Sequence, residues 1–208
     1  MAARSQSGKH DYWNHNVHYQ PVILDAVPLD CGPALEVGCG DGMLACRLAG
    51  RCAEVTAIDR DTRMIALARD RARRQAVANA TFTEADFLAC PVPEAGFDFA
   101  CANTSLHHMD FAAALAAMAR ALKPGGRLAV VGLAADGSPA DWLIGASGLP
   151  AYLVYRARYG HGGSGAPIKD PEMTWAEVRA AAASLLPGVR YRRRLLWRYS
   201  LRWTKPSG

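Results

Sequence analysis

An apolar run that passes into three closely spaced glycines constrains this chain more than any other feature. Residues 35–37 read Leu-Glu-Val, and glycines follow at positions 38, 40 and 42. Glycine adopts positive φ without a Cβ clash and lets the backbone approach a ligand closely. A helical pattern begins at Met43. The segment therefore predicts a strand, a tight ligand-binding turn and a helix.

A second apolar run ends in an acid. Residues 55–58 read Val-Thr-Ala-Ile, and Asp59 follows them. In α/β folds that bind nucleotides, an acid about 20 residues beyond the glycines binds the ribose. The two runs together favour a ligand that contains adenosine.

The spacing of the glycines distinguishes between adenosine ligands. A dinucleotide fingerprint reads G-x-G-x-x-G or A, which requires Gly or Ala at position 43. This chain has Met43, and its third glycine lies at 42, so the pattern is acid-x-G-x-G-x-G beginning at Glu36. The spacing therefore argues against a dinucleotide.

Length and composition predict one folded domain. The chain has 208 residues, of which 50% are hydrophobic and 21% charged, as in ordinary globular proteins. No apolar run approaches the length of a membrane span, and residues 1–10 lack the apolar core of a signal peptide. We expect a cytoplasmic protein without a membrane span. The 6 cysteines form no C-x-x-C pair and are expected to be reduced and buried.

Strands and helices alternate along most of the chain, which implies right-handed crossovers and a parallel sheet. The patterns predict strands at 35–37, 55–58, 81–83, 97–102 and 127–132, and helices at 43–49, 62–76 and 111–122. Lys123-Pro124-Gly125-Gly126 is expected to end the last of these helices. A helix at 174–186, with Thr174 and Glu177 as a capping box, precedes two closing strands at 189–195 and 199–204.

Four segments make up the single domain of residues 1–208. Residues 1–30 are expected to form an N-terminal cap, and residues 31–133 the ligand-binding core. Residues 134–171 break the alternating rhythm, and a long irregular stretch of this kind is often a lid or a substrate-binding insert. Residues 172–208 supply the closing helix and hairpin.

The order of these landmarks resembles that of the class I S-adenosylmethionine (SAM) dependent methyltransferases, in particular the small single-domain group that acts on metabolites. The resemblance covers most of the chain and rests on the glycine turn, Asp59, Glu84-Ala85-Asp86-Phe87, Phe97-Asp98-Phe99 and Leu122-Lys123-Pro124-Gly125-Gly126. It implies an α/β, Rossmann-like, doubly wound fold. The expected sheet has seven mostly parallel strands, with an antiparallel last strand.

The resemblance also implies a binding site for SAM and for its product, S-adenosylhomocysteine. Gly38, Cys39 and Gly40 would face the methionine and ribose parts through backbone groups. Glu36 would orient the turn or the amino group, and Asp59 would accept hydrogen bonds from both ribose hydroxyls.

Further residues complete the implied cofactor site. Asp86 would accept from the adenine amino group, and the Phe87 backbone would meet the ring edge. Asn103 would lie beside the methionine part, and Arg60 against the adenine face. Tyr12 and Tyr19 belong to the N-terminal segment that folds over the cofactor in the family, so Tyr12 or Tyr19 is expected to contact SAM.

His107 and His108 are the candidate catalytic residues, because they follow the fourth strand, at the sheet edge where ligands bind in open α/β sheets. Methyl transfer from sulfur is an in-line displacement, which depends mainly on positioning. A base adds to the rate where the acceptor is a hydroxyl or a protonated amine. A packing or helix-capping role for both histidines is the alternative.

The acceptor is expected to be a small, apolar or aromatic metabolite. The insert would cover it with Trp142, Leu143, Tyr152, Leu153 and Tyr155, unless these residues form an extra helix at the sheet edge. Whether an O, N or C atom is methylated is not determined by the sequence. No metal site is predicted, because His10, His15 and His18 have no Cys or acid partner at a regular spacing.

Two other functions remain open. Seven basic residues and no acids lie between Arg190 and Lys205, so a nucleic-acid methyltransferase is one alternative. However, residues 103–106 read Asn-Thr-Ser-Leu and lack the Asn/Asp-Pro-Pro-aromatic motif of enzymes that methylate base amino groups. The other alternative is a SAM-binding protein without transferase activity. The expected partner is a small molecule, with nucleic acid disfavoured, and the expected state is a monomer or a homodimer.

Overall fold

A computed structural model describes residues 12–160, 162–163, 165–166 and 169–207. The expectations for residues 1–10, which concern the missing signal peptide and His10, lie outside these described residues.

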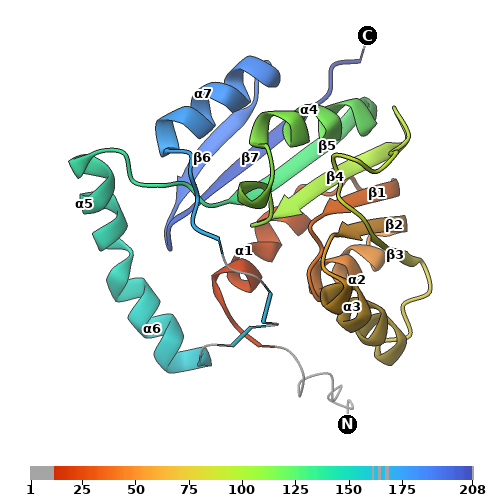
Figure 1. Ribbon diagram of the computed structural model, residues 1–208, viewed down its shortest axis with the longest axis horizontal. Coiled ribbons are helices and arrows are strands. Elements are labelled where there is room, and N and C mark those ends of the chain that lie inside the picture. The colour runs from red at the N-terminus through yellow and green to blue at the C-terminus, as the bar shows by residue number, and fades with distance from the viewer. Residues whose placement is uncertain (1–11, 161, 164, 167–168, 208) are drawn as a thin grey trace.

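The described chain forms one twisted sheet with helices on both faces (Figure 1). The strands are β1 (Cys31–Val37), β2 (Cys52–Asp59), β3 (Ala80–Glu84), β4 (Phe97–Asn103), β5 (Leu122–Gly132), β6 (Arg190–Arg194) and β7 (Arg198–Thr204). The helices are α1 (His15–Leu24), α2 (Met43–Ala49), α3 (Thr62–Arg74), α4 (Phe111–Ala121), α5 (Pro139–Ser147), α6 (Leu149–Tyr159) and α7 (Trp175–Leu185), with a short 3₁₀ turn η1 (Leu106–His108).

The sheet has the order β3-β2-β1-β4-β5-β7-β6. Strands β1 to β5 pair in parallel, and β7 inserts antiparallel between β5 and β6. The chain therefore winds outward from β1 in one direction and from β4 in the other. The predicted seven-stranded, doubly wound fold with an antiparallel last strand is confirmed.

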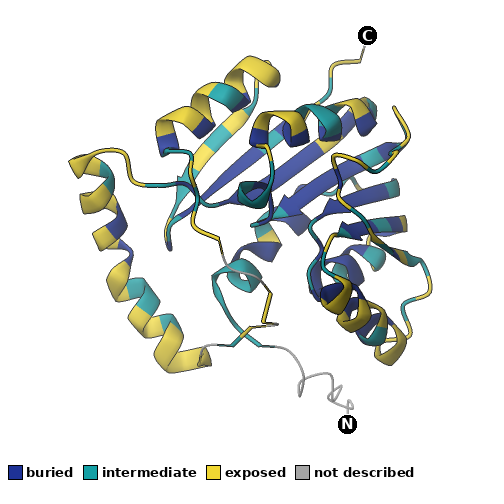
Figure 2. Ribbon diagram, in the orientation of Figure 1, coloured by how far each residue is buried: buried dark blue, intermediate teal, exposed yellow. Residues whose placement is uncertain are grey.

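Two hydrophobic cores lie on opposite faces of the sheet. In β4, Phe99 and Cys101 join the core that includes residues of α1, α2 and α3, whereas Ala100 and Ala102 join the core under α4 and α7. Successive side chains of a strand point to opposite faces, so a strand covered on both sides must be apolar throughout. Figure 2 shows the central strands buried and the outer helix faces exposed.

Side-chain caps define where several helices begin. Asp61 accepts hydrogen bonds from the backbone N–H groups of Arg63 and Met64 at the start of α3, as a cap residue does. The expected capping box at α7 is present, because Thr174 and Glu177 exchange hydrogen bonds. These caps explain why short local signals located both helices correctly.

Strand β5 begins earlier than the sequence predicts. The sequence predicts a helix stop at residues 123–126 and a strand from residue 127, but the strand already starts at Leu122, which pairs with Phe97. Gly125 has φ of +76°, and the register shifts between Phe97 and Phe99. The proline and glycines therefore still end α4, and the same residues form an irregular start to the next strand.

The insert at 134–171 is largely helical. Helices α5 and α6 lie along one side of the molecule (Figure 1). The indole of Trp13 stacks on Tyr155 and Tyr159, with ring centroids 5.5 and 5.9 Å apart, and these contacts hold α6 against the N-terminal segment. In the described part of the chain, no helix combines the length and hydrophobicity needed to cross a bilayer.

Most basic residues of the closing hairpin contact other parts of the protein. Arg193 pairs with Asp136 and Asp141, and its guanidinium lies 4.0 Å from the centre of the Trp175 ring. Further donors bind oxygens nearby: Arg194 Nε to Ser200 Oγ, Arg202 Nη2 to Val22 O, and Lys205 Nζ to Leu122 O. The local excess of positive charge therefore has a structural use, which weakens the case for nucleic-acid binding.

The turn after β1 offers a matched test of its packing. Gly40 and Gly42 both have positive φ, +53° and +75°. A Cβ at Gly40 would meet nothing within 4 Å, but a Cβ at Gly42 would lie 2.7 Å from Ala68 Cβ and 2.9 Å from Ala68 Cα. We expect Gly40→Ala to lower the free energy of unfolding by about 1–2 kcal/mol through φ alone. Gly42→Ala should cost about 1–3 kcal/mol more through overlap.

Chemical denaturation of both variants without SAM measures this difference. Equal losses of stability at the two positions would contradict the packing of the turn on α3.

Candidate functional site

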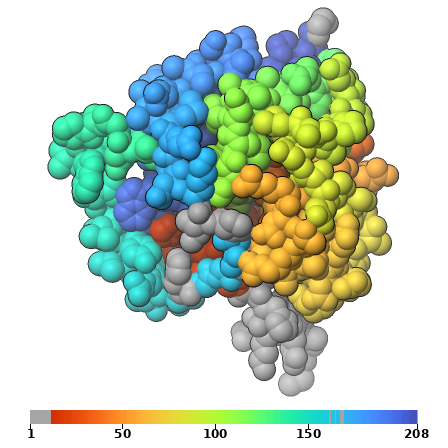
Figure 3. All heavy atoms as spheres, in the orientation of Figure 1, coloured from red at the N-terminus to blue at the C-terminus, as the bar shows by residue number. Residues whose placement is uncertain are grey.

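A cavity of about 850 Å³ lies at the carboxyl ends of the parallel strands. The strand order reverses between β1 and β4, and the crevice at such a reversal is where open α/β sheets bind ligands. The lining comes from the turn after β1, the ends of β2 and β4, the loop after β3, η1 and the N-terminal segment. In Figure 3, red atoms of the N-terminal segment are visible between the blue residues before α7 and the orange residues around α3.

The glycine turn packs tightly on one side and leaves space on the other. A Cβ at Gly38 would lie 2.2 Å from Ser105 Cβ, so only glycine allows this approach. The hydroxyl of Ser105 donates to Val37 O at 2.5 Å and holds the end of β4 against the turn. Gly40 lines the cavity, and its missing Cβ leaves open space above the backbone. A ligand can therefore come into contact with the peptide groups of the turn.

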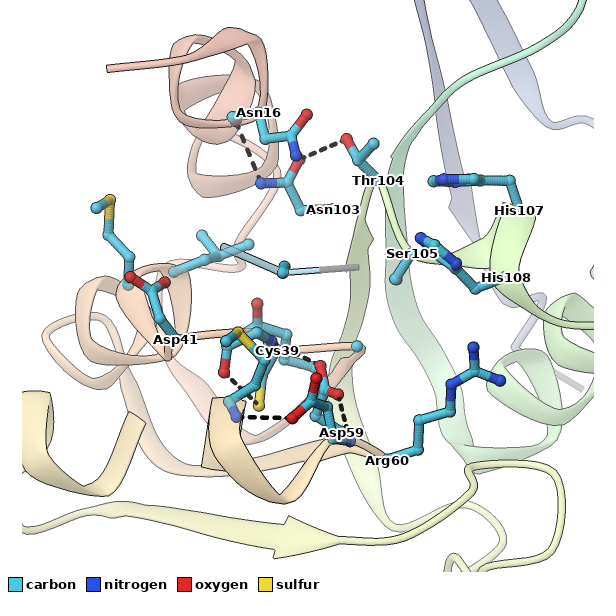
Figure 4. Close-up of a pocket in the computed structure, with 18 of the residues that line it drawn as sticks. Asn16, Cys39, Asp41, Asp59, Arg60, Asn103, Thr104, Ser105, His107 and His108 are labelled. Carbon is cyan, nitrogen blue, oxygen red and sulfur yellow. Dashed lines mark hydrogen bonds between the residues drawn. The ribbon is translucent and has the colours of Figure 1, made fainter. Parts of the chain in front are cut away.

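Asp59 organises the turn from the end of β2. Its Oδ2 accepts from Gly40 N at 2.8 Å, and its Oδ1 accepts from Asp61 N at 3.0 Å (Figure 4). A carboxylate accepts about four hydrogen bonds, so both oxygens keep capacity for a ligand. Asp59 lies in the cavity wall and is only partly buried.

Glu36 is a buried acid with an unused oxygen. Its exposed fraction is 1%, and its Oε2 has no hydrogen-bond partner among the described residues. Burial raises the pKa of this carboxyl well above its ordinary value, and the charges of Asp41 and Asp59 raise it further. Asp41 is paired with Arg71 at 2.7 Å, so that arginine is engaged elsewhere. A cation placed in the cavity beside Glu36 would relieve the cost of the unpaired group.

His107 and His108 form the wall at η1. Their ring centroids are 4.2 Å apart, both line the cavity, and His107 Nδ1 has no partner in the described chain. Burial lowers the pKa of His107 to about 4, with further contributions from His108, Arg198 and Lys169. The pKa of His108 is also lowered, first by burial and then by Arg60 and Lys169. Both imidazoles are therefore neutral at pH 7 and can accept a proton.

A hydrogen-bonded chain links three elements at the cavity. Asn103 Nδ2, at the end of β4, donates to Asn16 O of α1 at 3.2 Å. Asn16 Oδ1 accepts from Arg198 Nη2, at the start of β7, at 2.8 Å. Sequence reasoning missed Asn16 and Arg198 as site residues. Their signal was indirect, because Arg198 belonged to the basic cluster and Asn16 to a segment that is generally rich in polar and aromatic residues.

The structure brings most sequence-predicted site residues together. The cavity lining includes Glu36, Gly38, Cys39, Gly40, Asp59, Arg60, Asp86, Phe87, Asn103, His107 and His108. Figure 4 shows Arg60 extending on the same side of the site as the two histidines. Burial raises the pKa of the Cys39 thiol well above its usual value, so the thiol is inert here.

Tyr19 is a correction, because it does not line this cavity. Its exposed fraction is 7%, its ring is in the core between α1 and the sheet, and its hydroxyl donates to Leu195 O at 2.7 Å. The position of Tyr19 on α1 turns it toward the sheet. Tyr12, the expected alternative to Tyr19, precedes the helix and lines the cavity.

The insert also meets the cavity differently from the expectation. Trp142 and Leu143 are 73% and 75% exposed, and none of the five expected covering residues is part of the cavity wall. Tyr152 and Tyr155 instead contact His15 and His18 edge-on. The insert reaches the cavity through its glycine-rich part, with Gly162, Gly163, Gly165, Ala166 and Lys169. The described residues contain no cluster of three or more metal-ligating side chains.

Comparison with known proteins decides the family. A family model described as a methyltransferase domain matches residues 34–126. An uncharacterized methyltransferase of Mycobacterium tuberculosis is 37% identical over 196 residues, which is 93% of this chain and 98% of the relative. The chain belongs to the class I SAM-dependent methyltransferases. The 27-O-demethylrifamycin SV methyltransferase of Amycolatopsis mediterranei is 39% identical over 112 residues, which is 52% of this methyltransferase and 41% of that enzyme.

Solved structures agree with the fold of this methyltransferase. A SAM-dependent methyltransferase from Aquifex aeolicus has a TM-score of 0.62 at 17% identity, covering 89% of this chain and 88% of that one. A phosphoethanolamine N-methyltransferase from Haemonchus contortus in complex with SAM has a TM-score of 0.65 at 16% identity, covering 91% of this chain and 52% of that one. The family and the fold expected from the sequence are both confirmed.

Neutral His107 gives this methyltransferase a testable pH dependence. An unfolded histidine has a pKa of 6.5, whereas the folded value is about 4. The unfolded state therefore takes up a proton first, and the contribution of His107 to stability, complete above pH 6.5, is lost as the pH falls toward 4. His107→Gln cannot titrate, so its stability should fall less than that of the wild type across this range.

Denaturant unfolding at several pH values measures the difference between the two proteins. Parallel curves for wild type and variant would show that His107 is not buried in its neutral form.

Proposed function

We propose that this methyltransferase transfers the methyl group of SAM to an O, N or C atom of a small-molecule acceptor, with the donor bound at the turn after β1. The observation that carries this proposal is the unpaired, buried Glu36 next to the open space above Gly40. Such a site suits a ligand that approaches the backbone closely and carries positive charge. SAM has this chemistry, since it bears an ammonium and a sulfonium group.

The residues of the turn and of β2 would hold the donor. Asp59 would accept from the ribose hydroxyls with the capacity left after its bonds to Gly40 and Asp61. Glu36 would face the amino group, and Gly38 and Cys39 would contact the donor through their backbone. Their shared position at the end of β1 supports these roles.

The adenine would lie toward β3. Asp86 would accept from its amino group, and the backbone of buried Phe87 would meet the ring edge. Asn103 would lie beside the methionine part, where its amide is held by Asn16 O. Arg60 would flank the adenine or, given its direction in Figure 4, the space between adenine and acceptor.

When bound, the donor supplies a methyl group on a positively charged sulfur, and an in-line displacement moves that group to the acceptor. The protein holds the two reactants collinear, and such positioning contributes about 7–11 kcal/mol. His107 and His108 stand in the wall at η1, neutral at pH 7, and one of them would take the proton of a hydroxyl or ammonium acceptor. Because the pKa of His107 is so low, His108 is the stronger base.

A small-molecule acceptor is supported by the relatives and by the hairpin. The relative from Amycolatopsis mediterranei acts, by its name, on 27-O-demethylrifamycin SV. The basic hairpin residues that a nucleic-acid substrate would need are largely paired within the chain. A protein that binds SAM without transferring its methyl group would form no S-adenosylhomocysteine with any acceptor, so product formation separates these two possibilities.

The ribose role of Asp59 predicts a loss of donor affinity. Asp59→Asn keeps the size of the side chain but removes its charge and one acceptor. Because hydrogen bonds to charged groups contribute about 1.5–3 kcal/mol, we expect the Kd for S-adenosylhomocysteine to rise about tenfold or more. Isothermal titration calorimetry measures it.

Glu84→Gln is the matched control. Glu84 pairs with Asp59 across β2 and β3, bonds to Thr62 Oγ1, and is absent from the cavity lining, so its variant should bind normally. An unchanged Kd for Asp59→Asn would contradict the ribose assignment.

If a histidine of η1 acts as the general base, substitutions of His108 and His107 should lower kcat to different extents. His108→Gln should lower kcat by about 10²–10⁴, as loss of a general base does, and His107→Gln by less. The rate is measured as S-adenosylhomocysteine release with an acceptor selected from a panel of hydroxyl and amine compounds. His18→Gln is the control, since His18 packs on Tyr155 outside the cavity lining. If His107→Gln and His108→Gln both keep rates within a few-fold of the wild type, the two histidines have only a packing role.

A further inference from the structure

Arg198 is a buried cation without an acidic partner. Its exposed fraction is 8%, and it lines the cavity at the start of β7. Its guanidinium donates to Leu196 O at 3.1 Å, to Trp197 O at 3.4 Å and to Asn16 Oδ1 at 2.8 Å, all of them uncharged acceptors. Its Nε has no partner, and no carboxylate among the described residues pairs with Arg198. The positive charge is therefore not neutralised by the described chain.

An unpaired buried charge is costly, so a ligand that supplies the counter-charge would stabilise it. Burial lowers the pKa of Arg198 to about 10, so the group remains charged at neutral pH. The other basic residues of β6 and β7 do not line the cavity. Arg193 is paired with Asp136 and Asp141, whereas Arg194 and Arg202 donate to the uncharged acceptors Ser200 Oγ and Val22 O.

Charge is distributed unevenly around the cavity. The acids Glu36, Asp41 and Asp59 gather at the ends of β1 and β2, where the donor is proposed to bind. Arg198 lies beyond β4 and β5 in the strand order, close enough to His107 to lower its pKa together with Lys169. Lys169 is itself paired with Glu172, at 2.8 Å. Arg198 therefore brings an unneutralised positive charge to the cavity wall on the β7 side.

The sheet register places Arg198 beside the acceptor half. Tyr199, the next residue, pairs with Gly132 at the end of β5. Strands β4 and β5 separate β7 from β1, so Arg198 lies on the far side of these two strands from the glycine turn. An anion that binds there would lie beyond the donor, beside the histidines of η1.

We propose that the acceptor carries a carboxylate and that Arg198 binds it, as the residue that sets acceptor specificity. This inference rests on the proposed function, because it assigns a second ligand to the same cavity. A guanidinium with a free Nε suits a carboxylate, which it can bind through two parallel hydrogen bonds. The donor also has a carboxylate that Arg198 could bind. The experiment below distinguishes the carboxylate of the acceptor from that of the donor.

The test measures binding of matched probes to protein saturated with S-adenosylhomocysteine. The probes are linear carboxylates from butanoate to decanoate and their uncharged amides. The wild type should bind the best carboxylate about tenfold or more tightly than its amide, because only the carboxylate can pair with the guanidinium. Arg198→Met should abolish this preference without changing the Kd for S-adenosylhomocysteine, and Arg198→Lys should keep part of it.

The variant Asn16→Asp tests the same proposal independently, because it leaves the buried side chain of Arg198 in place. An aspartate there would lie at the position that now accepts from Arg198 Nη2, in the first turn of α1, where an acid is favourable. We expect this variant to melt at a higher temperature than the wild type and to lose the preference for carboxylates.

Three results would overturn the inference. Equal affinities for carboxylates and amides in the wild type would show that Arg198 is not an anion site. Loss of S-adenosylhomocysteine binding in folded Arg198→Met, or in Asn16→Asp, would assign the arginine to the donor's carboxylate. Failure of S-adenosylhomocysteine to bind the wild type at all would contradict the proposed function, and the inference with it.

Discussion

The close approach of the glycine turn to the end of β4 is the constraint on which the rest of the site depends. Gly38 and Ser105 can lie this close only because no Cβ stands between them, and the Ser105 hydroxyl bonds the end of β1. The turn also receives Asp59 from β2. Three strand ends are thereby fixed around one crevice. Every other residue of the site is placed relative to this junction.

The strand order places the acids Glu36 and Asp59 on β1 and β2 and the cation Arg198 on β7. The chain reaches its outer strands in opposite directions from β1 and β4, so the donor half is built from β1, β2 and β3. The other half is built from β4, β5 and β7, and from η1. Glu36 and Asp59 lie in the first half and Arg198 in the second. A sulfonium donor and an anionic acceptor would each meet the opposite charge, which favours their alignment along the cavity.

The fold could be predicted from the sequence because its signals are local. Apolar runs, the glycine turn and the Thr174–Glu177 capping box each occupy a few neighbouring residues. The start of β5 could not be predicted in this way, because Leu122 is drawn into the sheet by pairing with Phe97, far away in the sequence. Strand propensity alone would place the start of β5 after Pro124, Gly125 and Gly126.

For the site, too, local sequence signals could be used for prediction and tertiary contacts could not. Residues in motifs, such as Glu36 and Asp59, reach the cavity as expected. Tyr19 does not, because one residue's place on a short helix decides whether it faces the core or the ligand, and no pattern in the sequence fixes the rotation of α1. Arg198 could not be recognised, since its distinction from neighbouring arginines is its place in the cavity wall, which only the tertiary structure reveals.

A crystal structure with S-adenosylhomocysteine bound would show directly how the donor lies in the cavity. We expect the ribose hydroxyls on Asp59, the amino group beside Glu36, and the sulfur facing the part of the cavity lined by the η1 histidines and Arg198. The donor's carboxylate should not contact Arg198. Binding of the ligand away from the turn after β1, or in the reverse direction with adenine beside Arg198, would contradict the proposed donor site.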